Sequence, residues 1–158
     1  MVLTNVQLDI LKKLMRSSAQ KGNLANAGLV LRDGEVIASA ESLVVTNNDA
    51  TAHSERMLVS KVGEMMKSNY TPGLTIVTVV EPCTMCMSAC SQAGYRAIAY
   101  IIPAKRYVAQ IGWMTDVRDV NKQVLAKGYS SPIELLHLSD YEEEFCIIFE
   151  EVMAHLLK

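Results

Sequence analysis

Two short stretches, TAHSER at residues 51–56 and EPCTMC at residues 81–86, contain the residue types that bind metal ions and transfer protons. Cys83 and Cys86 are spaced so that, in the first turn of a helix, both thiols lie on the same side and can hold one ion. The N-terminus of a helix also favours the thiolate form that zinc requires. With a nitrogen ligand from His53, such a zinc ion would keep one open position, which is typical of a catalytic site.

Glu55 follows His53 by two residues and need not bind the metal itself. Facing the open position, its carboxylate could hydrogen-bond a water molecule whose pKa the zinc ion lowers towards neutrality. It could then take a proton from that water and pass it to a substrate nitrogen, which is general acid–base catalysis. The alternative interpretation is structural, because an acidic residue in the first turn of a helix interacts favourably with the helix dipole, by about 0.3–1 kcal/mol.

A third cysteine, Cys90, lies four residues after Cys86 and therefore on the same face of the predicted helix. As a fourth ligand it would close the site and make the protein a non-catalytic zinc module that binds a partner. We favour the interpretation of Cys90 as a small buried apolar residue, because each further residue lies about 1.5 Å further from the helix N-terminus.

The elements that must position these side chains follow from hydrophobic periodicity and turn signals. The Asp33-Gly34 pair predicts a hairpin within residues 26–40, and the β-branched run GLTIVTVV predicts a strand buried on both faces. In full, the sequence predicts helices over residues 4–20, 52–67, 84–94 and 103–112, strands over 73–80, 97–102 and 131–138, an irregular segment from 113 to Gly128, and a closing helix over 139–158 with a capping box of Ser139 and Glu142.

This order of elements, α-β-β-α-β-α-β-α-β-α, predicts an α/β fold, a three-layer α/β/α sandwich around a sheet of about five strands. The junctions near residues 51–53 and 80–84 both precede helices of that plan. Ligand sites in open α/β sheets gather at the carboxyl ends of strands, so we expect the two halves of the metal site to meet there.

Length and composition are those of one globular domain over residues 1–158, with 50 % hydrophobic and 20 % charged residues. The sequence has neither a signal-peptide pattern nor a run of about 18 apolar residues. We therefore expect a cytoplasmic protein without a membrane segment, in which the cysteines stay reduced. A formal charge of −2 and the lack of a basic run argue against nucleic acid as a partner.

HSE followed by PCTMC resembles the H-x-E…P-C-x-x-C signature of the zinc-dependent cytidine and nucleobase deaminases. The resemblance extends over about residues 5–102 and includes the segments GLVLRDGEVIASA, NDATAH and EPCTMCMSAC. In length and pattern the chain is most similar to guanine deaminases and tRNA adenosine deaminases. The resemblance implies a cytidine deaminase-like fold, zinc bound by His53, Cys83 and Cys86, and Glu55 as the proton shuttle. A zinc-bound hydroxide would attack the carbon that bears an exocyclic amine, and ammonia would leave.

Two substrate-binding positions depart from the family pattern. The family commonly has a base-binding asparagine eleven residues before the zinc histidine, where this sequence has Ser42. Either Ser42 binds the base with a shorter side chain, or Asn47 or Asn48 does so from the following loop.

Guanine deaminases of this type also read the base with an aspartate after the fourth strand, where this sequence offers Asp116 and Asp119. Trp113 is the candidate for an aromatic side chain that covers the bound base by stacking. Such changes around an intact metal motif are what a changed substrate would produce.

The leading hypothesis is therefore hydrolytic deamination of a small aminated heterocycle, with a guanine-like purine favoured over cytosine-like, cytidine-like or triazine-like rings. The second is a tRNA adenosine deaminase, which would need a basic face, whereas the last predicted helix is acidic. The third is the non-catalytic zinc module. The resemblance also implies a homodimer, with or without exchange of C-terminal segments, and the apolar stripe CIIF offers room for an interface.

Overall fold

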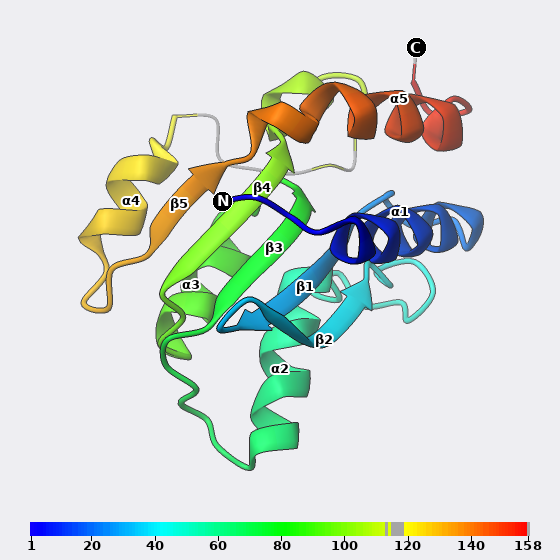
Figure 1. Cartoon of the computed structure of the whole chain (residues 1–158). Coiled ribbons are helices and arrows are strands. Elements are labelled where there is room, and N and C mark those ends of the chain that lie inside the picture. Colours follow the sequence, from blue (N-terminus) through cyan, green and yellow to red (C-terminus); the bar gives the residue numbers. More distant parts are fainter. Residues whose placement is uncertain (113, 115–118, 158) are drawn as a thin grey trace.

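A five-stranded sheet with the strand order β2-β1-β3-β4-β5 forms the middle layer of the molecule (Figure 1). The structure, a computed structural model, describes residues 1–112, 114 and 119–157. Strand β1 is antiparallel to β2 and β3, whereas β4 is parallel to β3 and to β5. The strands are β1 (Ala27–Arg32), β2 (Glu35–Glu41), β3 (Thr75–Val80), β4 (Ala97–Ile102) and β5 (Glu134–His137).

Helices cover both faces of the sheet, which confirms the three-layer α/β/α sandwich (Figure 1). Helices α1 (Asn5–Gln20) and α5 (Glu142–Met153) pack on one face through residues that include Leu11, Met15, Phe145 and Phe149. Helices α2 (Ser54–Met66), α3 (Thr84–Gln92) and α4 (Lys122–Gly128) cover the other face through residues that include Leu58, Val62, Met87 and Ala126.

The central strands and the hairpin form where the sequence predicts them. All six residues of β3 are buried, as expected for a strand with a helical layer on each face. Asp33 and Gly34 both have positive φ, 51° and 83°, the backbone geometry of a two-residue hairpin turn.

Three predictions for the C-terminal third were wrong. The predicted helix over 103–112 is a single 3-10 turn at Ala104–Arg106, and the segment expected to be irregular contains α4. The capping box of Ser139 and Glu142 does not form, because Glu142 is bound by Arg106 (2.7 Å) and His137 (3.0 Å) and is itself the first residue of α5.

The topology brings three chain segments to one edge of the sheet. Helix α2 begins after the loop that follows β2, and α3 begins directly after β3. Because β1 is antiparallel to β3, with Gly28 opposite Thr78, the residues that precede β1 lie beside the carboxyl end of β3. The site therefore draws on the starts of α2, α3 and β1. None of the helices in the described part of the chain has the length and apolar character needed to cross a lipid bilayer.

Candidate active site

His53, Cys83 and Cys86 lie together at the N-termini of α2 and α3. His53 is the N-cap residue of α2, Cys83 is the N-cap residue of α3, and Cys86 lies in the first turn of α3. Their donor atoms all lie within 4.8 Å of one another, and Cys83 Sγ is 3.5 Å from His53 Nδ1. The structure thus joins two motifs that are thirty residues apart in the sequence.

Hydrogen bonds and burial shift the pKa values of these three residues. A hydrogen bond from Cys86, supported by His53, lowers the pKa of Cys83 and favours its thiolate form. The same hydrogen bond, together with burial, raises the pKa of Cys86, and the bond to Cys83 raises the pKa of His53. Two sulfurs and one imidazole nitrogen converge here, and this set of donors could hold a zinc ion and would leave it one open position.

Glu55 lies in the first turn of α2, 2 % exposed, beside the sulfur ligands. Its Oε2 atom is 3.6 Å from Cys86 Sγ. Its Oε1 atom accepts hydrogen bonds from Asn26 Nδ2 (3.1 Å) and Thr78 Oγ1 (2.7 Å). A carboxylate held next to a metal site, with one oxygen directed towards the ligands, can take up and release protons there.

A cavity of about 430 Å³ opens directly onto these groups. Its volume is in the range that accepts small molecules, which is about 300–1,000 Å³. Its polar lining includes Asn26, Ser42, His53, Glu55, Glu81 and Cys83. Its apolar lining consists of Leu24, Val44, Val45, Ala50, Val80, Ala104, Val108 and Met114. Apolar walls with polar groups gathered at one place suit a flat heterocycle with a few hydrogen-bonding groups.

Of the candidate substrate-binding residues in the described part of the chain, some line the cavity and others do not. Ser42 is buried and lines the cavity, at the position where the family pattern has asparagine. Asn48 is exposed, with a positive φ of 50°, and is not among the described residues that line the cavity. Trp113 and Asp116 lie outside the described residues, and Asp119 is exposed.

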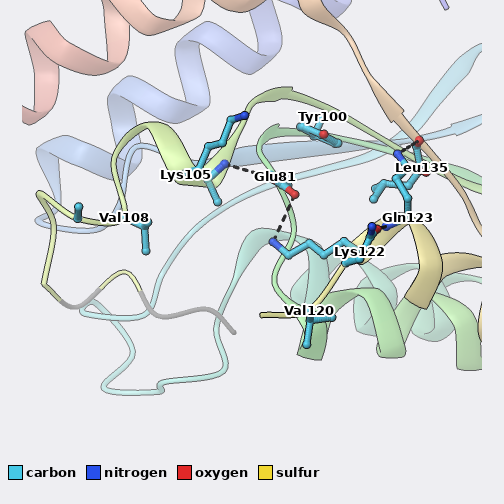
Figure 2. A pocket seen from close by; sticks show the side chains of 11 residues that line it. Glu81, Tyr100, Lys105, Val108, Val120, Lys122, Gln123 and Leu135 are labelled. Atoms are coloured by element: carbon cyan, nitrogen blue, oxygen red, sulfur yellow. Dashed lines mark hydrogen bonds and ion pairs between the residues drawn. The ribbon is translucent and has the colours of Figure 1, made fainter. Parts of the chain in front are cut away.

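A second cavity, of about 570 Å³, adjoins the first (Figure 2). Glu81, Ala104 and Val108 line both cavities. The Glu81 side chain accepts a hydrogen bond from the backbone N–H of Ala104 (2.9 Å) and lies 3.5 Å from Lys122 Nζ. Figure 2 shows this carboxylate between the two partners, which hold Glu81 in place where it lines both cavities.

Asn26 and Thr78 both hydrogen-bond Glu55, and neither was predicted from the sequence. Thr78 left a weak signal, because it is one of two threonines in the run GLTIVTVV. Asn26 left none, because it lies in a loop and reaches Glu55 through the pairing of β1 with β3.

A three-layer α/β sandwich whose helix N-termini bring two cysteines, a histidine and a buried glutamate together is characteristic of the zinc-dependent deaminase class. Residues 5–102 match the family described as the cytidine and deoxycytidylate deaminase zinc-binding region. The chain belongs to this family, and His53, Cys83 and Cys86 are its candidate zinc site.

Relatives of two kinds are similar to the chain. It is 32 % identical over 85 residues to a tRNA-specific adenosine deaminase of Agrobacterium fabrum, a match that covers 54 % of this chain and 56 % of the relative. It is also 32 % identical over 72 residues to the guanine deaminase of Bacillus subtilis, with 46 % of each chain covered. The chain thus matches about half the length of these relatives.

Solved structures show the same fold. A guanine deaminase from Nitrosomonas europaea superimposes with a TM-score of 0.81 at 20 % identity, covering 98 % of this chain and 87 % of that one. A structure from a study of tRNA:A34 deaminases gives a TM-score of 0.76 at 20 % identity, covering 92 % and 99 %. At such identities the likeness concerns the fold alone.

Proposed function

We propose that this protein is a hydrolytic deaminase that replaces the exocyclic amine of a small heterocycle by oxygen, with water consumed and ammonia released. The observation that carries this proposal is the buried carboxylate of Glu55 beside the Cys83, Cys86 and His53 donor atoms, where Glu55, His53 and Cys83 line a 430 Å³ cavity. A zinc ion bound by these donors supplies the Lewis acidity that brings the pKa of water towards neutrality.

The residues of the chain divide the remaining work. Glu55 accepts the two protons of the attacking water one after the other, and delivers the first to a ring nitrogen and the second to the departing amine. Val44, Val80 and Val108 hold the flat faces of the ring and exclude bulk water from the cavity. This proton transfer converts an aminated ring carbon and one water molecule into a carbonyl and ammonia.

A guanine-like purine free base is the substrate we favour. The cavity has the size of a small molecule, and apolar residues form most of its lining beside several polar groups. The formal charge is −2, and the first turn of α5 carries Glu142, Glu143 and Glu144, which disfavours a polyanionic substrate. The Bacillus subtilis guanine deaminase is among the relatives.

A tRNA adenosine deaminase is the second candidate. It is favoured by the similarity to the tRNA-specific adenosine deaminase of Agrobacterium fabrum, at the same 32 % identity over a longer match of 85 residues. The same chemistry at the metal site would serve adenosine in an anticodon loop, provided that the loop can insert a flipped base into the cavity.

One assay distinguishes these substrates. Zinc-loaded protein is incubated with guanine, adenine, cytosine, the corresponding nucleosides and an anticodon stem-loop containing adenosine, and ammonia release is measured together with bound zinc. We expect release from guanine or a closely related base. Release from the stem-loop alone would favour the second candidate, and inactivity of fully zinc-loaded protein on the whole panel would contradict the deaminase proposal.

A further inference from the structure

The side-chain amide of Asn26 is fixed in one orientation by its surroundings. Its Oδ1 atom accepts hydrogen bonds from the backbone N–H groups of Ala27 (3.0 Å) and Val80 (2.9 Å). Because both of these partners are donors, the oxygen end must face them, and the NH₂ end must face Glu55 Oε1 at 3.1 Å. Asn26 therefore donates to the Glu55 carboxylate from a side chain that is itself buried.

Thr78 supplies a second donor to the same oxygen atom. Its hydroxyl is fully buried and lies 2.7 Å from Glu55 Oε1, 3.1 Å from the Val80 carbonyl and 3.2 Å from Asn26 Oδ1. A hydroxyl has one proton to donate, and the carboxylate is both the shortest and the charged acceptor of the three. A buried hydroxyl in an apolar strand is costly unless it is paired, and this contact provides the pair.

Two donors on Oε1 leave Oε2 as the oxygen directed towards the metal-binding side chains, 3.6 Å from Cys86 Sγ. We propose that Asn26 and Thr78 are positioning residues that anchor Glu55 through Oε1, so that Oε2 is the oxygen that transfers protons during the reaction. The catalytic part of this inference rests on the proposed deaminase function, whereas the anchoring itself does not.

The anchoring matters because the carboxyl group of a glutamate rotates readily about its last side-chain bond. A carboxylate free to rotate would present either oxygen at varying distances from the reacting atoms. Proton transfer requires a heavy-atom separation of about 2.6–3.2 Å. A fixed orientation therefore increases the fraction of time that the Glu55 carboxylate spends within this distance of the reacting atoms.

Thr78→Val and Thr78→Ser test the proposal most cleanly. Valine removes the hydroxyl while keeping the shape, and serine keeps the hydroxyl. Thr75→Val is the matched control, because Thr75 is also buried in β3 but lies at the opposite end of the strand, opposite Leu31. Asn26→Ala is less informative, since Asn26 also satisfies two backbone N–H groups.

Bound zinc, the unfolding temperature, kcat and KM are measured for each variant with the substrate identified by the panel. We expect Thr78→Val to keep its zinc and its KM within about threefold but to lose about 10- to 100-fold in kcat. Thr78→Ser should recover kcat to within about threefold, and Thr75→Val should match the wild type. A Thr78→Val kcat within about twofold of wild type would overturn the proposal.

A second readout does not depend on activity. In ¹⁵N-labelled protein, the side-chain NH₂ signal of Asn26 is assigned by its loss in Asn26→Ala, and its hydrogen exchange is measured. We expect slow exchange in the wild type and faster exchange in Glu55→Ala. Unchanged exchange in Glu55→Ala would overturn the anchoring, even in an active enzyme. If exchange is faster in Glu55→Ala but the zinc-loaded wild type is inactive on the whole substrate panel, the anchoring is supported and the deaminase function is contradicted.

Discussion

Cys86 and Cys90 lie four residues apart on the same side of α3, yet their surroundings differ. Cys86 lies with His53 and Cys83 in the candidate metal site, whereas Cys90 packs among apolar residues that include Leu58, Met87 and Ile98. The sulfur of Cys90 is fully buried and does not belong to the group of donor atoms that His53, Cys83 and Cys86 form. These surroundings favour the open, three-ligand site over the closed, four-ligand one.

Removal of either thiol gives a matched pair of tests. Cys86→Ala should lower bound zinc from about one ion per chain to a small fraction, because it removes one of three ligands. Cys90→Ala creates a comparable buried cavity but should keep its zinc. Metal analysis of both purified variants makes the comparison, and loss of zinc from Cys90→Ala would favour the non-catalytic zinc module instead.

At the scale of elements, the site depends on the close packing of α2 against β1. A Cβ atom added to Gly28 would lie 2.9 Å from Leu58 Cδ1 of α2 and 3.0 Å from the Val77 carbonyl of β3. The start of α2 holds both His53 and Glu55, so displacement of this helix would also disturb the site.

Gly28→Ala should therefore destabilise the fold by about 1–3 kcal/mol, because the Leu58 side chain must move and the Val77 carbonyl must give way to make room. Gly128→Ala is the control, since no described atom lies within 4 Å of the added Cβ and this glycine ends α4. Denaturant unfolding measures both free energies. Equal stability of Gly28→Ala and wild type would contradict the tight contact between α2 and β1.

The elements also show how far the sequence could predict the structure. Strand β3 and the Asp33-Gly34 hairpin were predictable, because a buried apolar run and a turn pair are local signals. The capping box at Ser139 was not, because Glu142 binds Arg106 and His137 from elsewhere in the chain.

The same distinction holds within the site. That His53, Cys83 and Cys86 lie together was predictable, because their residue types and spacing are typical of metal ligands. The anchor of Glu55 was not, because Asn26 reaches it only through the antiparallel pairing of distant strands. Long-range pairing is the information that local patterns lack.

At the scale of the whole molecule, charge separates the two candidate substrates. Protein–RNA affinity arises largely from phosphate contacts and falls steeply with salt. With a formal charge of −2 and an acidic first turn of α5, we expect no measurable binding of the protein to tRNA even at low salt. Fluorescence anisotropy with a labelled anticodon stem-loop tests this, and tight, salt-sensitive binding would favour the tRNA deaminase.

A homodimer remains a prediction, and the structure changes which residues could form it. The CIIF stripe of α5 does not form a free apolar face, because Cys146, Ile148 and Phe149 pack into the core, and only Ile147 of the four, 59 % exposed, faces outwards. We expect a dimer in sedimentation velocity. If Ile147 lies in its interface, Ile147→Glu should shift the protein towards the monomer, and an unchanged dimer would exclude this residue from the interface.

The most direct test of the proposed chemistry compares wild type with Glu55→Gln, measuring bound zinc and ammonia release on the same samples. Glutamine keeps the size of the side chain but cannot accept a proton at neutral pH. We predict about one zinc ion per chain in both proteins and at least about 100-fold slower ammonia release in the variant. A zinc-loaded Glu55→Gln protein that releases ammonia at the wild-type rate would contradict the role of Glu55.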